Sequence, residues 1–125
     1  DDLAQGHFFF QKEKYESAQH HFETYIRIHG DKLDAIDARY YAALCAVKLD
    51  RPDGEAQFHQ FIKAYPRSPQ AMLAHYQIGN LYFTKQDFTQ SIVYYLRVDP
   101  HTLDKATRQE LQYRLAYAYL SEMNF

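Results

Sequence analysis

Histidine is the residue type in this sequence that most invites a chemical role, because imidazole binds metals and transfers protons near neutral pH. Two ligands on one helix face lie three or four residues apart, and no two of the seven histidines do. The adjacent His20 and His21 diverge by about 100° on a helix. We therefore expect hydrogen-bonded or solvated histidines, and neither a metal nor another cofactor. The seven are His7, His20, His21, His29, His59, His75 and His101.

Acid–base or nucleophilic chemistry has two further candidates. Asp34 and Asp37 share a helix face, but no nucleophile or glycine-rich loop accompanies them, which favours pairing with a helix N-terminus. Cys45 occupies a core place in the repeat pattern described below, which favours a buried, inert thiol. The sequence contains no phosphate-binding loop, serine elbow or dinucleotide fingerprint. We therefore expect that the protein is not an enzyme.

The composition limits the classes of partner. Of the 125 residues, 46% are hydrophobic and 17% aromatic, which is enough apolar material for one packed domain. The formal net charge of -2 lacks the basic excess that neutralises phosphates, so no nucleic-acid partner is expected. No apolar run reaches the roughly 20 residues that a membrane span needs, so no transmembrane segment is expected.

Small residues recur along the chain with a period of 36 or 37 residues. Large and aromatic side chains recur in the same register at helical spacings. Two helices cross closely only where neither carries a bulky side chain, so this pattern predicts antiparallel helix pairs with small residues at the crossings. The first small set is Gly6, Ala42, Gly79 and Ala116, and the second is Ala18, Gly54 and Ser91.

Start and stop signals divide the chain into helices without strands. Ser68 before Pro69 is typical of a helix start, and Asp87 with Gln90 is typical of a capping box. Gly30 suits a left-handed helix stop. The seven predicted helices span residues 2–13, 15–29, 32–49, 52–65, 69–85, 88–98 and 102–122. They form a single domain over residues 1–125, with three hairpins and the first helix of a fourth, in units of about 1–30, 31–67, 68–101 and 102–125.

Small residues at the eighth and twentieth repeat places, with aromatics at the eleventh and twenty-fourth, resemble the tetratricopeptide repeat (TPR) family over the whole chain. The best stretch runs from Tyr65 to Tyr95. The resemblance implies an all-α fold, a right-handed superhelix of helical hairpins. The second unit departs most, because Arg51 replaces the seventeenth-place aromatic and Cys45 is small for its place. Its helix pair is therefore the one expected to pack at a different angle.

The junction Tyr65-Pro66-Arg67-Ser68-Pro69 is similar to the bacterial envelope branch of the family, which includes outer-membrane assembly lipoproteins and coordinators of the Tol system. That resemblance implies a protein of the periplasm or outer membrane in a Gram-negative bacterium, with a cytoplasmic location as the alternative.

The last predicted helix carries apolar side chains on several faces, whereas a repeat array normally closes with a polar helix. We therefore expect the chain to be a segment of a longer repeat protein. The alternative is that a partner chain covers this surface, and the uncovered helix would then favour self-association. The side chains concerned are Tyr113, Leu115, Tyr117, Tyr119 and Leu120.

In the resembling family, the first helix of each unit lines a concave groove. Carried over by repeat place, this surface combines aromatic rings with a few hydrogen-bond donors, which suits an extended peptide or an amphipathic helix. The alternative for several of these tyrosines is packing between adjacent hairpins. The residues carried over are His7, Phe10, Arg39, Tyr76, Gln77, Asn80, Phe83, Tyr113, Arg114 and Tyr117.

The leading functional prediction is a non-catalytic scaffold that holds a protein or peptide partner in this concave groove. One alternative is a structural spacer or self-assembly segment of a larger envelope protein. Another is a glycan-binding lipoprotein module, which the tyrosine-rich groove and the similar repeats of carbohydrate-capture lipoproteins suggest.

Overall fold

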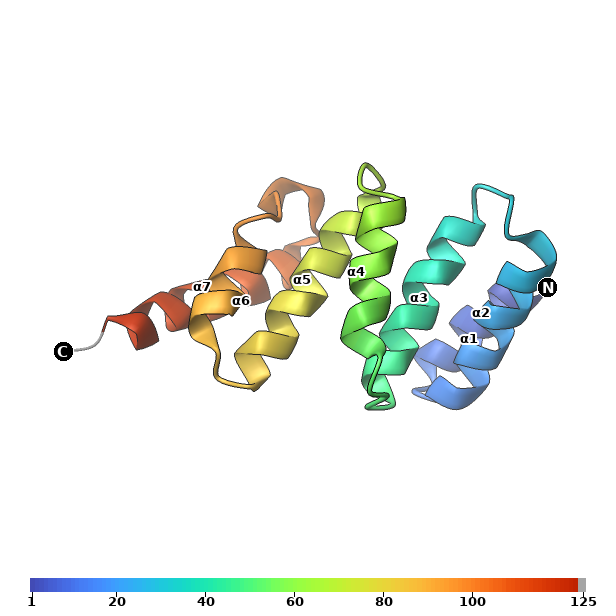
Figure 1. Cartoon of the computed structure of the whole chain (residues 1–125), viewed down its shortest axis with the longest axis horizontal. Coiled ribbons are helices and arrows are strands. Elements are labelled where there is room, and N and C mark those ends of the chain that lie inside the picture. The colour runs from blue at the N-terminus through green and yellow to red at the C-terminus, as the bar shows by residue number, and fades with distance from the viewer. Residues whose placement is uncertain (124–125) are drawn as a thin grey trace. The chain divides into compact units, whose positions relative to one another are not determined.

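The computed structural model describes residues 1–123, and this part of the chain is helical without a strand (Figure 1). Seven α-helices and one short 3₁₀ helix occur in it, so the all-α prediction is confirmed. In chain order they are α1 (Asp2–Gln11), α2 (Tyr15–His29), α3 (Ala35–Lys48), α4 (Gly54–Ala64), α5 (Pro69–Thr84), α6 (Phe88–Tyr95), η1 (Pro100–Thr102) and α7 (Lys105–Glu122).

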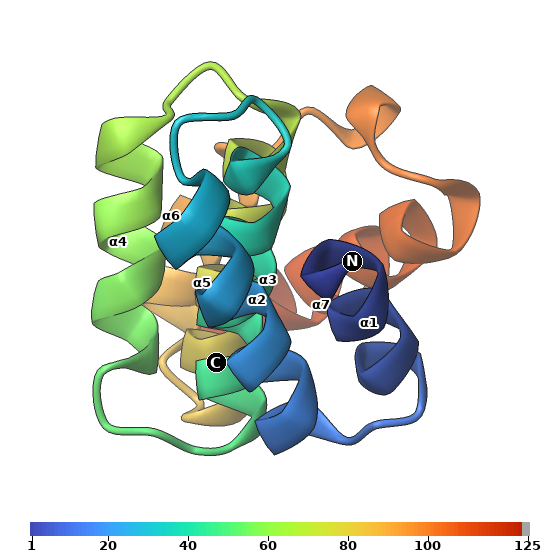
Figure 2. The ribbon, with the colours of Figure 1, turned by 90° about the vertical axis from the view of Figure 1, so that its right-hand side faces the viewer.

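The chain divides into two compact units, residues 1–70 and 71–125. In the first unit, α1 and α2 run antiparallel side by side (Figure 2), α2 packs against α3, and α3 packs against α4. In the second unit, α5 faces α6 through Gly79 and Tyr95, and α6 packs against α7. The predicted helix pairs are thus present within each unit.

The core of the first unit forms where aromatic residues of α2 meet small residues of α3. Phe22 and Tyr25 of α2 are buried, and the α3 face in this cluster consists of alanines and Cys45. Short side chains on α3 let the two helices approach closely and leave room for the rings. The buried members of this cluster are Ala18, Phe22, Tyr25, Ala35, Ala38, Ala42 and Cys45.

Two glycines lie at helix crossings, as the repeat pattern predicts. An added Cβ at Gly6 would lie 2.6 Å from the Phe22 ring, and one at Gly79 would lie 2.5 Å from the Tyr95 ring. Side-chain atoms do not approach each other so closely in a packed interior, so both crossings require glycine. The aligned Ala116 is exposed on α7, and no further helix covers it within residues 1–123.

The turn after the first helix of each hairpin repeats with the same backbone geometry. Glu13, Asp50 and Gln86 follow α1, α3 and α5, and all three have a positive φ of 58° to 61°. In each turn the next residue's N–H bonds the carbonyl five residues back at 2.9 Å, which is the Schellman arrangement. Glycine usually occupies the left-handed position, so sequence inspection overlooked these stops.

At Gly30 the sequence predicted a left-handed conformation that the structure does not have. Its φ is -63°, which is right-handed, so it is not the left-handed helix stop expected from the sequence. An added Cβ there would lie 2.5 Å from the Ile26 carbonyl oxygen and 3.0 Å from Nη2 of Arg39. Glycine is therefore suited to this position by the close approach of its neighbours rather than by its backbone conformation.

All predicted helix ends fall within three residues of the observed ones, and the largest shifts have local causes. The last helix was expected from residue 102 but begins at Lys105. Asp99 caps the separate 3₁₀ helix before it, and Asp104 then caps α7 by accepting a hydrogen bond from the Thr107 N–H at 2.9 Å. Two acidic caps in succession thus replace the single start that the sequence suggested.

Gly79→Ala tests the close crossing. We expect this substitution to lower the free energy of unfolding by about 1–3 kcal/mol, because the new methyl group overlaps the Tyr95 ring. Helix propensity alone predicts the opposite sign, a gain of about 1 kcal/mol. Urea unfolding followed by circular dichroism measures the change. Ala116→Ser, at the exposed aligned place, should stay within about 0.5 kcal/mol; a stabilised Gly79→Ala variant would contradict the crossing.

Candidate binding groove

The side chains that first suggested chemistry occupy structural positions. Nδ1 of His21 lies 2.9 Å from Oδ1 of Asp2, and this contact ties α2 to α1. Asp34 accepts a hydrogen bond from the Tyr25 hydroxyl at 2.7 Å. Cys45 is fully buried, and burial raises the pKa of its thiol to about 12. Within residues 1–123, no three potential metal-ligating side chains lie together.

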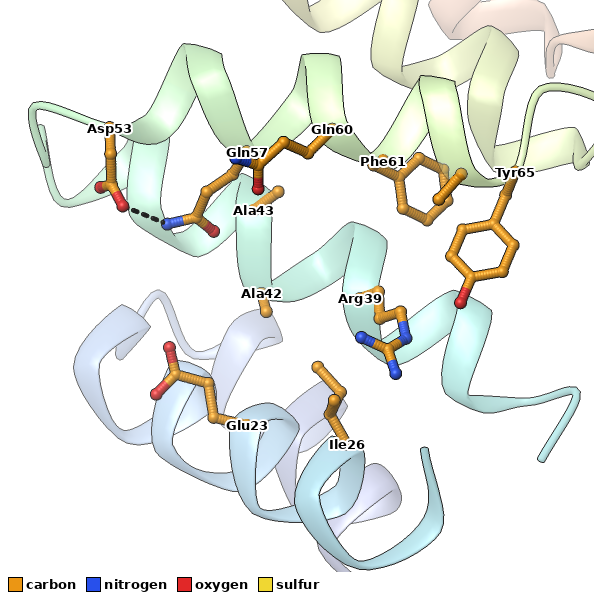
Figure 3. Close-up of a pocket in the computed structure, with 11 residues that line it drawn as sticks. Glu23, Ile26, Arg39, Ala42, Ala43, Asp53, Gln57, Gln60, Phe61 and Tyr65 are labelled. Atoms are coloured by element: carbon orange, nitrogen blue, oxygen red, sulfur yellow. Dashed lines mark hydrogen bonds between the residues drawn. The ribbon is translucent and has the colours of Figure 1, made fainter. Parts of the chain in front are cut away.

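Two predicted groove residues lie elsewhere, and the structure corrects their assignment. Tyr76 on α5 is only 5% exposed, with its ring centroid 6.0 Å from that of Tyr95. Arg39 on α3 lines a hollow beside Ile26 of α2 and Phe61 of α4 (Figure 3). Both residues stand at the fifth repeat place, three residues before the small residue of the crossing. They therefore share its helix face. Tyr76 turns toward Tyr95 of α6, whereas the Arg39 guanidinium reaches the Gly30 carbonyl at the end of α2.

His7 and Phe10, predicted from the ninth and twelfth places to line the groove, contact α3, the first helix of the next hairpin. Nε2 of His7 lies 2.7 Å from Oδ2 of Asp37 on α3, and its ring meets Tyr41 edge-on at 4.6 Å between centroids. Phe10 contacts the same Tyr41 ring at 5.2 Å. These half-buried side chains therefore pack α1 against α3 in the first unit.

Four predicted residues come together in the second unit, where they line a hollow of about 380 Å³. Phe83 comes from the end of α5, and Tyr113, Arg114 and Tyr117 come from α7. Tyr113 is the most open of them, with 69% of its surface exposed. We call this hollow the α5–α7 groove; its lining residues are Phe83, Thr84, Gln86, Phe88, Tyr113, Arg114 and Tyr117.

Aromatic contacts hold the walls of the α5–α7 groove in place. The Tyr117 ring lies 5.5 Å from Phe83 and 5.7 Å from Phe88, centroid to centroid. The Arg114 guanidinium lies over the Phe83 ring at 5.5 Å, and its Nη2 is 2.7 Å from Oε1 of Glu110. A guanidinium fixed by both a ring and a carboxylate loses little further freedom when a ligand arrives.

The other predicted groove residues of the second unit, Asn80 and Gln77, lie on α5. The Tyr95 hydroxyl donates a hydrogen bond to Oδ1 of Asn80 at 2.6 Å. Burial raises the pKa of Tyr95 to about 12 and also raises the pKa of Tyr76 above its usual value, so both hydroxyls stay protonated at neutral pH. Asn80 thus fastens α6 to α5, while Gln77 is half-buried on α5.

Sequence reasoning missed Phe88 as a groove residue, although the repeat alignment contained the signal. Phe88 occupies the seventeenth place and meets the twelfth-place Phe83 edge-on at 5.4 Å. Tyr15 and Phe10 stand at the same two places in the first hairpin and also meet at 5.4 Å. The pair at these places is therefore a recurring contact across the hairpin turn.

Comparison with protein families finds one segment of the chain that matches a known repeat. Residues 74–99, which cover most of α5 and all of α6, match the model of the tetratricopeptide repeat. No curated protein matches the chain significantly. No helix in residues 1–123 combines the length and the apolar character that crossing a membrane requires.

The raised pKa of Tyr95 predicts a loss of stability in alkali. The unfolded chain releases this proton near pH 10, whereas the folded chain holds it to about pH 12. Between these values the unfolded state binds fewer protons, so the free energy of unfolding falls as pH rises. Urea unfolding from pH 8 to 11.5 should show this fall, and Tyr95→Phe should show a shallower one. Equal slopes in the two proteins would contradict the role of Tyr95.

Proposed function

We propose that this chain is a non-catalytic interaction module that holds a peptide or protein segment in the α5–α7 groove. Tetratricopeptide repeats generally mediate protein–protein interactions, and the matched segment supplies one wall of the groove. The observation that carries the proposal is the exposed Tyr113 ring beside the fixed Arg114 and Tyr117 side chains. Exposed aromatic and arginine side chains of this kind dominate the energetics of protein interfaces.

The charges of the groove define what it would select. Arg114 is paired with Glu110, so the groove offers little unbalanced charge to attract a ligand from a distance. The Tyr113 and Tyr117 rings, whose centroids lie 6.5 Å apart, offer an aromatic contact surface instead. We expect a segment with an aromatic or branched apolar anchor, oriented by the guanidinium and by the polar side chains of Thr84 and Gln86.

Tyr113→Ala tests the groove. Peptides selected by display against the immobilised full chain are measured by calorimetry, and Tyr113→Ala should weaken their binding at least tenfold, which is about 1.4 kcal/mol. Tyr119→Ala is the matched control, because Tyr119 is 45% exposed on the same helix but does not line the groove. Circular dichroism should show unchanged helicity in both. Equal loss in the two variants, or none in Tyr113→Ala, would reject the α5–α7 groove.

Self-association through α7 is the second candidate function, because this helix exposes several large apolar side chains at its C-terminal half. Leu120 is 66% exposed, and Met123, directly after the helix, is 53% exposed. Exposed apolar patches commonly mark interfaces in proteins.

Leu120→Glu tests this candidate. Sedimentation velocity of the unchanged protein should show a sedimentation coefficient that rises with concentration, whereas Leu120→Glu should stay monomeric because a carboxylate opposes burial of the patch. Leu33→Glu is the matched control, since Leu33 is 85% exposed in the turn before α3. A monomer at all concentrations, or the same effect from Leu33→Glu, would reject α7 as the contact.

We also propose that the protein is located in the bacterial envelope. The support for this location is the Tyr65-Pro66-Arg67-Ser68-Pro69 junction, in which Pro69 opens α5 and the Ser68 hydroxyl donates a hydrogen bond to the Tyr65 carbonyl at 2.8 Å. Fractionation of cells that express the protein under its own promoter would test it.

A further inference from the structure

A second hollow, in the first unit, is lined by residues that the groove prediction did not include apart from Arg39. It has a volume of about 490 Å³, with walls from α2 and α4 (Figure 3). Its floor is formed by Ala42 and Ala43 of α3, both buried. Because the alanine side chains are short, a cavity stays open above them, between the longer side chains of α2 and α4. We call this cavity the α2–α4 hollow.

In the α2–α4 hollow, the acidic side chains lie at one end and the basic side chain lies at the other. Figure 3 shows Glu23 and Asp53 on opposite walls toward one end, whereas Arg39 lies at the other end beside Tyr65. Asp53 precedes the first residue of α4 and Tyr65 follows its last, so the hollow follows the whole of that helix. Its ends are therefore about 18 Å apart at 1.5 Å per residue.

Arg39 lacks an anionic partner in the described part of the chain. Its Nη2 donates one long hydrogen bond of 3.4 Å to the Gly30 carbonyl, and its buried Nε has no partner at all. Half-buried charges in proteins are normally paired, because leaving water is costly for them. A ligand carboxylate at this end of the hollow would supply the missing charge.

Side-chain amides lie between the charged ends. Gln57 donates a hydrogen bond from Nε2 to Oδ2 of Asp53 at 3.0 Å, which leaves its own carbonyl oxygen to accept another. Gln60 is exposed one turn further along α4 and lines the same hollow. Amides in a row on one helix match the N–H and C=O groups of an extended chain.

We propose that the α2–α4 hollow binds a short extended peptide segment that carries an acidic group at its Arg39 end and a basic side chain at its Glu23 and Asp53 end. Five extended residues span about 17 Å at 3.3 Å each, which fits the length of α4. The acidic group would pair with the Arg39 guanidinium, and the basic side chain would lie between the two carboxylates. This site is distinct from the α5–α7 groove, so either can fail without the other.

Calorimetric titration of the full chain with two capped pentapeptides tests the proposal. The first, Lys-Ala-Leu-Ala-Glu, carries both charges, and the second, Gln-Ala-Leu-Ala-Gln, carries neither. We expect the charged peptide to bind at least tenfold more tightly at 50 mM salt. Comparable binding of the two peptides, or no detectable binding of the charged one at 5 mM, would overturn the proposal.

Variants assign the two ends of the peptide. Arg39→Gln should weaken the charged peptide at least fivefold, and so should Glu23→Gln, which alters an exposed side chain and cannot act through the core. Arg27→Gln and Glu16→Gln change the same charges on exposed α2 positions outside the hollow and should leave binding unchanged. Equal effects in the two control variants would show that net charge alone governs binding, and would overturn the site.

An alkyl zwitterion separates peptide recognition from charge recognition. 12-Aminododecanoic acid carries an ammonium and a carboxylate at the two ends of a plain chain without amides, and its length is comparable with that of the charged peptide. We expect it to bind at least tenfold more weakly than the charged peptide, because it offers nothing to Gln57 and Gln60. Equal affinity would assign the hollow to alkyl zwitterions and overturn the peptide as its occupant.

Discussion

At two hairpin crossings a glycine lies directly against an aromatic ring, and this contact sets how each helix pair packs. At Gly6 and Gly79 the partner ring occupies the space that a Cβ would take, so each helix pair meets at one fixed point along both helices. A fixed crossing decides which face of the first helix turns toward its hairpin partner. Tyr76, one turn before Gly79, is thereby directed into the core, whereas Phe83, one turn after Gly79 on the same face, lies at the end of α5 and lines the groove.

The hairpin turns complete this constraint at a cost in backbone energy. Left-handed conformations at Glu13, Asp50 and Gln86 each cost a non-glycine residue about 1–2 kcal/mol. Each turn recovers two hydrogen bonds for carbonyl groups at the helix end, which would otherwise lack partners. The turn also brings the twelfth- and seventeenth-place rings together, as Phe83 and Phe88 show at 5.4 Å. One wall of the α5–α7 groove is therefore a direct product of the turn geometry.

Much of the fold could be predicted from the sequence because its signals are local. Period, helix spacing and capping residues involve neighbours in the chain, and they gave all seven helices with ends correct to three residues. The site was harder, since carrying residues over by repeat place assumed that the fifth place faces the groove. Burial of Tyr76 and the position of Arg39 show that this assumption fails in the second and third hairpins, whereas Tyr113, at the same place in α7, does line the groove. Gly30 misled for a related reason, because close neighbours rather than a positive φ favour glycine there.

The second hairpin shows how one change of residue type at the fifth place can alter what a repeat offers. In the third hairpin the fifth place holds Tyr76, whose ring fills the space beside Tyr95. In the second hairpin the same place holds Arg39, a longer and thinner side chain, and α3 packs on α4 through Tyr40, 5.9 Å from Phe58 and 6.0 Å from Phe61. The space that a ring fills in one hairpin is thus left open in the other, with a cation at its edge. Because the backbone repeat tolerates this exchange, a packing position in one unit becomes a recognition position in the next.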